Sequence, residues 1–387
     1  MKSFIAPLIF ILALSACTAK PVAQDEEPHV FPTDTLSQDL VAFPVSTQFD
    51  IVMVGDALLH SNVYNDAKVG DTYDFTKQYT LVRDYIEPYD LAFYNQETIL
   101  GGTELGLSTY PRFNSPYEFG DAMVDLGFNL VSLANNHTYD RGLKAIENTM
   151  AYWGQQPVVT AGAYLSQEAR DAVNVYEMNG ITYGFLAYTW SLNGLKLPTD
   201  KQYLVPTFDQ AGEEARMVRD ITALRPLVDV VIVSLHLHLE YITKPTSYQI
   251  RLAKLCASLG VDLVIQNHAH SIMPMERIGK TFVIYALGNF VSGQKDIGTK
   301  IGAFAALDIR KEVWGNESYI FIENPRVDFH YTHNTQPSYR NTQVIPFDDL
   351  STSILPDKAY YENFYLNVIN ARGINLTLGG VKKSTGN

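Results

Sequence analysis

The sequence has little cysteine and a shortage of positive charge, and both narrow the class of protein. Only two of its 387 residues are cysteine, Cys17 and Cys256, so a disulfide-stapled scaffold is not expected. Lys and Arg number 29 against 42 Asp and Glu, which gives a formal net charge of −13 at pH 7. A surface this acidic lacks the basic footprint that a nucleic-acid partner requires. It does not exclude an anionic substrate, because a metal-lined pocket reverses the charge locally.

The apolar run near the N-terminus is too short to span a bilayer, which takes about 20 residues. It covers residues 4–14, follows a basic start and precedes Leu-Ser-Ala-Cys at residues 14–17. This order is typical of a secretory signal, here residues 1–16. The last four residues resemble the lipobox of bacterial lipoproteins, so we expect Cys17 to carry lipid and to tether the protein to the extracytoplasmic face of the cell membrane. A plain signal peptide cut near Ala16 is the alternative.

The rest of the chain divides by composition and hydrophobic pattern. Residues 17–48 are rich in Pro, Asp, Glu, Ser and Thr, which predicts a flexible acidic spacer. From residue 49 short apolar runs alternate with amphipathic ones, which predicts an α/β domain over 49–310. Residues 311–387 are interpreted as a β-rich extension of the same domain and a tail. The predicted strands are 49–54, 90–93, 129–133, 157–160, 181–188, 228–235, 262–265 and 281–286, and the predicted helices are 115–126, 142–153, 208–224 and 247–259.

Polar side chains follow five of these predicted strands, at the point where each strand ends. Ligands of open α/β sheets bind outside the carboxyl ends of strands, so residues brought there by several strands converge on one site. Six of the nine histidines lie in these segments. The segments are Gly55–His60, Asn95–Glu97, Ala134–Asp140, His236–Glu240 and Asn267–His270.

The residue types in these segments suit a metal centre. Imidazole, carboxylate and amide oxygen together favour Mn, Fe or Zn over Ca. Two ions held about 3.5–4 Å apart need a bridging group, and the Glu97 carboxylate is the natural one. Each segment alone has an ordinary explanation, since Asp56 could cap a helix and Asn135-Asn136 could form a turn. Five segments in one chain favour the metal site.

Several motifs resemble the CapA family, bacterial proteins tied to poly-γ-glutamate capsule synthesis. The most specific are Ala-Asn-Asn-His-x-x-Asp-x-Gly at residues 134–142 and Leu-Gly-Asn-Phe at residues 287–290, and the likeness runs from about residue 50 to 291. The resemblance implies a calcineurin-like metallophosphatase fold, a four-layer α-β-β-α sandwich. It also implies a divalent metal cofactor of two ions (Mn, Fe or Zn).

The resemblance also assigns roles to individual residues. It makes His137 the catalytic residue, a proton donor beside the substrate. The implied metal ligands are Asp56, His60, Glu97, Asn136, His236, His268 and His270. The residues expected to support these ligands or to contact substrate are Asn95, Asn135, Asp140, Arg141, His238 and Glu240. The first motif departs from the family pattern, because Leu58 stands where a metallophosphatase has histidine and His60 is the nearest one.

Three functions fit these features. The first is a metal-dependent hydrolase or transferase that acts on a phosphoester or on the γ-glutamyl polymer. The second is a non-enzymatic accessory subunit of a membrane polymer-synthase complex for synthesis or export, which binds the anionic polymer through metal or through Arg112 and Arg141. The third is a secreted phosphoesterase with no link to a capsule. The near-complete set of ligand types favours the enzyme.

The lipid anchor is tested by Cys17→Ala. Two acyl chains hold a protein stably at a membrane, and this variant would carry no acyl chain. We therefore expect it to move from the membrane fraction to the soluble fraction. Fractionation of cells followed by immunoblotting measures the shift. Continued tight membrane association of the variant would contradict the lipobox interpretation.

Overall fold

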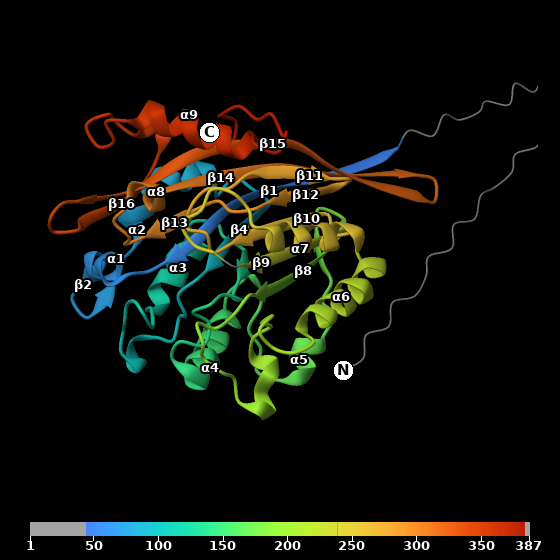
Figure 1. Cartoon of the computed structure of the whole chain (residues 1–387), viewed down its shortest axis with the longest axis horizontal. Coiled ribbons are helices and arrows are strands. Elements are labelled where there is room, and N and C mark those ends of the chain that lie inside the picture. The colour runs from blue at the N-terminus through green and yellow to red at the C-terminus, as the bar shows by residue number, and fades with distance from the viewer. Residues whose placement is uncertain (1–43, 238, 384–387) are drawn as a thin grey trace, which may run out of the picture. The chain divides into compact units, whose positions relative to one another are not determined.

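Two β-sheets face each other across the centre of the protein, as the computed structural model of residues 44–237 and 239–383 shows (Figure 1). The first sheet has eight strands in the order β16 (Arg340–Pro346), β15 (Glu317–Thr335), β14 (Ile301–Trp314), β1 (Val45–Leu58), β4 (Leu91–Gln96), β5 (Leu130–Ser132) and β6 (Val159–Ala161), with β13 (Asn289–Ser292) also paired to β1. The second has six, in the order β11 (Met275–Ile278), β12 (Thr281–Ile284), β10 (Leu263–Asn267), β9 (Val230–His236), β8 (Ile181–Thr189) and β7 (Tyr176–Met178).

The strands are apolar on both faces, and side-chain alternation explains why. Successive residues of a strand point to opposite faces of its sheet. In β1, Phe49, Ile51 and Met53 pack into the core between the sheets, whereas Val52 and Val54 pack outward against helices. The other central strands divide in the same way. A continuous apolar run of this kind is typical of a strand covered on both sides.

Helices cover the two outer faces and complete four layers. α3 (Tyr117–Asp125) and α4 (Gly142–Trp153) pack on the first sheet, and α6 (Glu213–Leu224) and α7 (Ser247–Ser258) pack on the second. Cys256 is a buried free thiol on the apolar face of α7. The expected α-β-β-α fold is therefore confirmed. The remaining elements are α1 (Ser61–Asp66), β2 (Lys68–Val69), β3 (Thr72–Tyr73), α2 (Thr76–Tyr79), α5 (Gln167–Asp171), α8 (Ile297–Lys300), α9 (Lys358–Asn370) and five short 3₁₀ turns, Thr80–Tyr85, Thr103–Leu105, Thr199–Leu204, Arg225–Leu227 and Phe347–Asp349.

The predicted domain boundaries need correction at both ends. β1 begins at Val45, before the predicted start at residue 49, because residues 45–48 pair with the far end of β14. The predicted boundary at 310/311 falls inside β14, and the β-rich extension continues the first sheet as part of the same domain. It also contains helix α9, whose Tyr365 and Ile369 close one edge of the core between the sheets.

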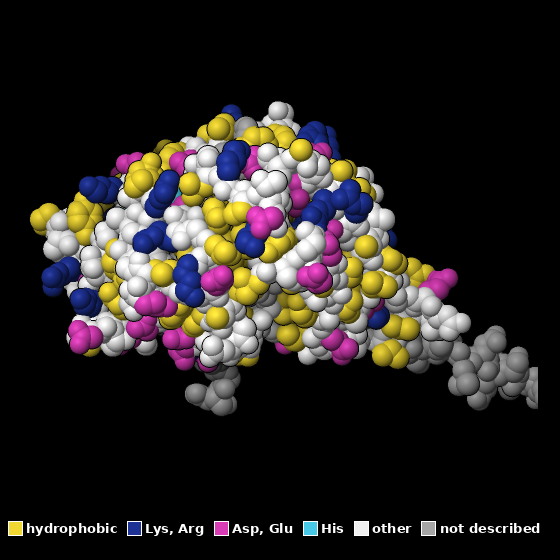
Figure 2. All heavy atoms as spheres, turned by 90° about the horizontal axis from the view of Figure 1, so that it is seen from below, with side chains coloured by type: hydrophobic (Ala, Val, Ile, Leu, Met, Phe, Trp, Pro, Cys, Tyr) yellow, Lys and Arg dark blue, Asp and Glu magenta, His cyan; other side chains and the backbone are white. Residues whose placement is uncertain are grey.

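The predicted signal peptide, Cys17 and most of the predicted spacer lie outside the described residues. Within residues 44–237 and 239–383, no helix is both long enough and apolar enough to cross a membrane. On the face drawn in Figure 2, Lys and Arg side chains are interspersed with Asp and Glu. That face shows no broad basic surface of the kind a nucleic acid would need.

The parallel strands of both sheets end on the same side of the protein. β1, β4 and β5 are parallel neighbours in the first sheet. β8, β9, β10 and β12 are parallel neighbours in the second. The polar segments that follow these strands therefore meet across the gap between the two sheets.

Gly55 lies where β1 approaches the main chain of Gly288, beside this edge of the sheets. A Cβ at Gly55 would lie 1.9 Å from the Gly288 carbonyl oxygen, just where the Asp56 N–H donates to that oxygen. We expect Gly55→Ala to lower the free energy of unfolding by about 1–3 kcal/mol, because β13 must move away from β1. Denaturant titration measures the change. The control is Gly154→Ala at the end of α4, where the nearest contact is 3.2 Å, and equal losses in both variants would contradict the steric explanation.

Candidate metal centre

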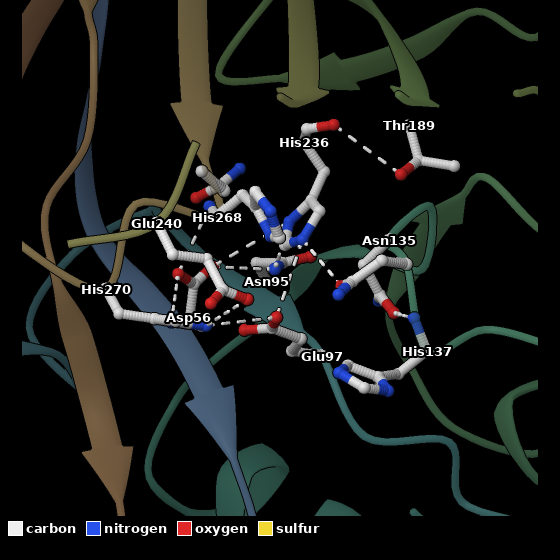
Figure 3. A network of polar contacts seen from close by, with 12 residues as sticks. Asp56, Asn95, Glu97, Asn135, His137, Thr189, His236, Glu240, His268 and His270 are labelled. Carbon is white, nitrogen blue, oxygen red and sulfur yellow. Dashed lines mark hydrogen bonds and ion pairs between the residues drawn. The ribbon is translucent and has the colours of Figure 1, made fainter. Parts of the chain in front are cut away.

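Polar side chains from both sheets converge on one buried cluster (Figure 3). The first sheet contributes residues from β1, from the end of β4 and from the loop after β5. The second sheet contributes His236 at the end of β9 and the histidines after β10. Nearly all are buried. The members are Asp56, Asn95, Glu97, Asn136, His236, His268 and His270.

Glu97 lies at the centre of this cluster, and its carboxylate receives no hydrogen bond from the described residues. Its side chain is fully buried, and neither carboxylate oxygen has a hydrogen-bond partner among the described residues. Its Oε1 lies 3.4 Å from His236 Nε2 and 3.6 Å from His270 Nε2. A buried carboxylate without donors costs several kcal/mol unless a cation compensates it. The residues present therefore fit a metal ion.

The atoms available to such an ion lie close together. One ligand atom from each of Glu97, His268 and His270 falls within 4.8 Å of the others. Nδ1 of the buried His268 also lacks a partner among the described side chains. Two imidazoles and a carboxylate form a donor set that suits Zn, Mn or Fe. The cluster thus supports a divalent metal.

Asp56 organises the histidines through its two oxygens. Oδ1 accepts a hydrogen bond from Asn95 Nδ2 at 2.8 Å, and Oδ2 accepts one from the His268 backbone N–H at 3.2 Å. His270 Nδ1 lies 3.2 Å from the same Oδ2 and 2.9 Å from Asn289 Oδ1. These acceptors hold the Nδ1 side of the His270 ring, so Nε2 faces Glu97. Fixing a ligating ring through its second nitrogen is how proteins orient metal-bound histidine.

His236 links the second sheet to the loop after β5. Its Nε2 lies 2.9 Å from Asn136 Oδ1, and its Nδ1 lies 3.2 Å from Asn95 Nδ2. Asn136 in turn donates from Nδ2 to Asn193 Oδ1 at 3.3 Å. Asn136, His236 and Glu97 therefore present three ligand-type atoms to one another from three different strand ends.

The backbone of the two histidines after β10 is in the left-handed region. His268 has φ of 89° and His270 has φ of 52°. Residues with a side chain rarely adopt this conformation, which costs of order 1–3 kcal/mol and is concentrated at functional sites. Hydrogen bonds to Asp56 and Asn289 hold both residues in place. The strained turn aims both rings at Glu97.

Burial and mutual charge set the protonation of the cluster. Burial raises the pKa of Glu97 to about 8. Burial opposes charge on His270, but the Glu97 carboxylate and the Asp56 hydrogen bond outweigh it and raise the pKa of that imidazole to about 10. Burial lowers the pKa of His236 to about 3 and places the pKa of His268 well below its usual range. At pH 7, His236 and His268 are therefore neutral, the form that binds metal.

His137 lies beside the cluster but is held differently. Its Nδ1 lies 2.7 Å from Asp140 Oδ2, which also accepts a hydrogen bond from the Phe113 backbone N–H at 2.7 Å. The Phe113 ring packs edge-on against the His137 ring with centroids 4.7 Å apart. His137 and Asp140 both line a cavity of about 550 Å³. This pair has the form of an imidazole oriented by a carboxylate for proton transfer.

The other predicted site residues are placed less directly. His60 Nδ1 faces Leu58 O and the Gly293 N–H, both at 3.2 Å, and its ring packs edge-on against Phe113 with centroids 5.2 Å apart. Arg141 bonds to the carbonyls of the loop at residues 105–106. Glu240 Oε1 lies 4.0 Å from His270 Nε2.

Asn135 and His238 were predicted to support the metal ligands or to contact substrate. Asn135 donates to Gln96 O and accepts from the His137 backbone N–H, so it shapes the loop. His238 lies outside the described residues. Asn193 and Asn289 were not predicted. Asn289 had a visible signal, since it follows an apolar run within Leu-Gly-Asn-Phe, whereas Asn193 lies in a loop without any pattern.

Comparison with known proteins shows which family the chain belongs to. A family model described as "Bacterial capsule synthesis protein PGA_cap" matches residues 50–294, more than half of the chain. The chain belongs to this family. The match contains every member of the buried cluster, while β15, β16 and α9 lie beyond it. The resemblance inferred from the motifs is thereby confirmed.

Two curated relatives are similar to this chain over about half of its length. The PGA biosynthesis protein CapA of Bacillus subtilis (strain 168) is 27% identical over 203 residues, 50% of this chain and 50% of the relative. The capsule biosynthesis protein CapA of Bacillus anthracis is 28% identical over 194 residues, 49% of this chain and 46% of the relative. The chain thus spans about half the length of the curated relatives it matches.

Two solved structures have a lower sequence identity to this chain, 15% in each case. A candidate 5′-nucleotidase of Staphylococcus aureus in complex with α-ketoglutarate covers 82% of this chain and 58% of its own, with 15% identity and a TM-score of 0.44. The sulfate thiohydrolase SoxB of Thermus thermophilus covers 73% of this chain and 42% of its own, with 15% identity and a TM-score of 0.36. The four-layer fold itself follows from the sheets and helices of this chain.

Metal binding should depend on pH in a defined direction. With pKa values of about 8 and about 10, the Glu97–His270 pair holds at least one proton at pH 7 in the metal-free protein. A divalent ion must displace that proton, so its affinity should rise from pH 6 to pH 8, by up to about tenfold per pH unit for each proton released. Calorimetric titration of Mn²⁺ in two buffers of different ionisation heat counts the protons. Glu97→Gln should bind weakly with a flatter profile. Affinity independent of pH in the wild type would contradict this assignment.

Proposed function

We propose that this chain acts outside the cytoplasm in the synthesis or export of capsular poly-γ-glutamate, with a metal-dependent hydrolase or transferase site. The observation that carries the proposal is the buried Glu97 carboxylate, whose oxygens have no donor among the described residues and face imidazoles from the other sheet. Membership of the capsule synthesis family and the names of the two Bacillus relatives support the biological setting.

The chain's own residues divide into holding and reacting groups. Glu97, Asn136, His236, His268 and His270 would hold the metal. Glu97 Oε1 is within 3.6 Å of two imidazoles that face it from different strands, which supports a bridging role and hence two ions. When bound, divalent ions of this kind activate water at neutral pH and stabilise developing negative charge.

His137 is the group that moves a proton. Asp140 accepts from the Nδ1 side of its ring, which leaves Nε2 to donate to the leaving group. Both residues line the cavity beside the cluster, where substrate has room. Asp140 holds the Nδ1 side of the ring and so orients Nε2. A phosphoester or an amide of the γ-glutamyl polymer would each need this proton at departure.

The anchor and the partners complete the proposal. A lipid on Cys17 would hold the domain at the outer face of the membrane, where a polymer emerges, and a membrane polymer-synthase complex is the expected partner. Support for this part comes from the sequence motif at residues 14–17. Cysteine lipidation with two chains is sufficient for stable attachment.

The decisive comparison is between His137→Ala and Glu97→Ala. Because His137 makes no contact that a ligand needs, its variant should keep metal and lose turnover by about 10²–10⁴-fold, the usual contribution of a positioned acid. Glu97→Ala should lose both metal and turnover. Elemental analysis of the purified proteins gives metal content, and assays on poly-γ-glutamate and on nitrophenyl phosphoesters give activity.

Each other result has a definite meaning. A metal-free His137→Ala protein would make His137 a ligand and would contradict its role as the acid. If both variants restore full polymer production in cells that lack the protein, the cluster is not catalytic. The chain would then act as a non-enzymatic polymer-binding subunit. Turnover of phosphoesters without any effect on polymer would instead indicate a general secreted phosphoesterase.

A further inference from the structure

The cavity beside His137 has an unbalanced set of charges. Three loops line it, at residues 110–112, 193–195 and 240–241, and Asn136, His137 and Asp140 form the part next to the cluster. Its volume of about 550 Å³ is large enough for more than the atoms that react. Substrate that occupies this cavity would lie against these loops.

Arg112 is the one Lys or Arg among the described residues that line this cavity. It is exposed, and its side chain forms no hydrogen bond or ion pair within the described part of the chain. The carboxylates that line the same space are engaged elsewhere. Asp140 accepts from His137 and from the Phe113 N–H, and Glu240 lies 4.0 Å from His270. Arg112 thus lines the cavity without an ion-pair partner among the described residues.

The loop that carries Arg112 is fixed at its base. Ser108 and Asn114 pair as an antiparallel bridge, with N–H donors 3.1 and 3.2 Å from the opposite carbonyl oxygens. The Arg141 guanidinium holds the same loop through Leu105 O and Gly106 O. The Arg112 N–H donates to Thr109 O at 3.2 Å. The two arginines are therefore not equivalent: Arg141 is held by two main-chain carbonyls and the Ser108 hydroxyl, and Arg112 is presented on a braced turn.

This turn is also joined directly to the reacting group. Phe113 follows Arg112 in the chain, packs against the His137 ring and donates its N–H to Asp140. The position of Arg112 is therefore set relative to His137. A cation whose backbone is anchored beside a proton donor favours substrates that carry an anion within its reach of the bond that breaks.

We propose that Arg112 is a specificity-determining residue that binds a carboxylate of the substrate chain next to the group held at the metal cluster. The inference rests on the proposed function and narrows its substrate class to a chain with repeating carboxylates. A free carboxylate on each γ-linked residue supplies such an anion beside every scissile amide. Guanidinium matches carboxylate in a two-point hydrogen-bonded geometry.

The test uses Mn²⁺-loaded full-length protein and four forms of it: wild type, Arg112→Gln, Arg112→Lys and the control Arg219→Gln. Arg219 is an arginine on α6 that does not line the cavity. Substrates are poly-γ-glutamate fragments and the same fragments with carboxylates converted to methyl esters. Arg112→Gln should raise KM for the acidic fragments by about 10–100-fold, with kcat changed less than about twofold, since a charge-assisted contact is lost from binding.

Arg112→Lys should recover part of this loss, and added salt should reduce the difference between variants because the contact is exposed. The methyl esters should show no dependence on Arg112, and Arg219→Gln should match wild type throughout. Equal losses on acidic and esterified fragments would overturn the proposal and indicate a structural role. An Arg112 dependence seen only with poly(glycerol phosphate) would overturn the carboxylate assignment.

Equilibrium binding separates this inference from the proposed activity. Fluorescence anisotropy with labelled poly-γ-glutamate fragments should give a dissociation constant about 10–100-fold higher for Arg112→Gln than for wild type. If no form turns over substrate but this binding difference persists, the catalytic proposal fails and the Arg112 site stands. If wild type turns over the polymer and Arg112→Gln matches it in KM and binding, the Arg112 site fails and the catalytic proposal stands.

Discussion

The structure of this site depends on one constraint, the burial of the Glu97 carboxylate without a hydrogen-bond donor. Neither oxygen is satisfied by the described residues, although Glu97 is fully buried. Nearly every buried polar group in a folded protein has a partner, and an isolated buried charge is far more costly than a neutral one. The imidazoles facing Glu97 ease this cost only in part, so a cation accounts for the arrangement best.

The surrounding network keeps the ligands in place and strains the backbone to do so. Asp56 and Asn289 hold His270, while Asn95 lies between Asp56 and His236. His268 and His270 remain in the left-handed region because these bonds fix them there. Backbone strain of this kind is expected where metal binding offsets it, because binding energy and folding energy are shared in such sites.

The histidines around the cavity lie in two different environments. His236 and His268 are buried with lowered pKa values and present neutral nitrogen to a cation. His137 is outside that group, paired with Asp140 and open to the cavity. Arg112 lies one residue from the ring that packs on His137. In the proposed function, metal holding, proton transfer and substrate recognition would therefore occupy neighbouring but separate side chains.

The sequence by itself determined the alternation of strands and helices and the polar residues at strand ends, because periodicity and residue type are local properties. Those local signals placed five polar segments at strand ends, and the family resemblance singled out Asp56, Glu97, Asn136, His236, His268 and His270 within them. Only the tertiary structure decided that residues from two sheets meet, that β1 starts at Val45, and that β14 runs through the predicted boundary. It also turned His60 toward main chain and brought Asn193 and Asn289 into the network. These outcomes depend on strand pairing and sheet packing between residues far apart in the chain, which no local pattern encodes.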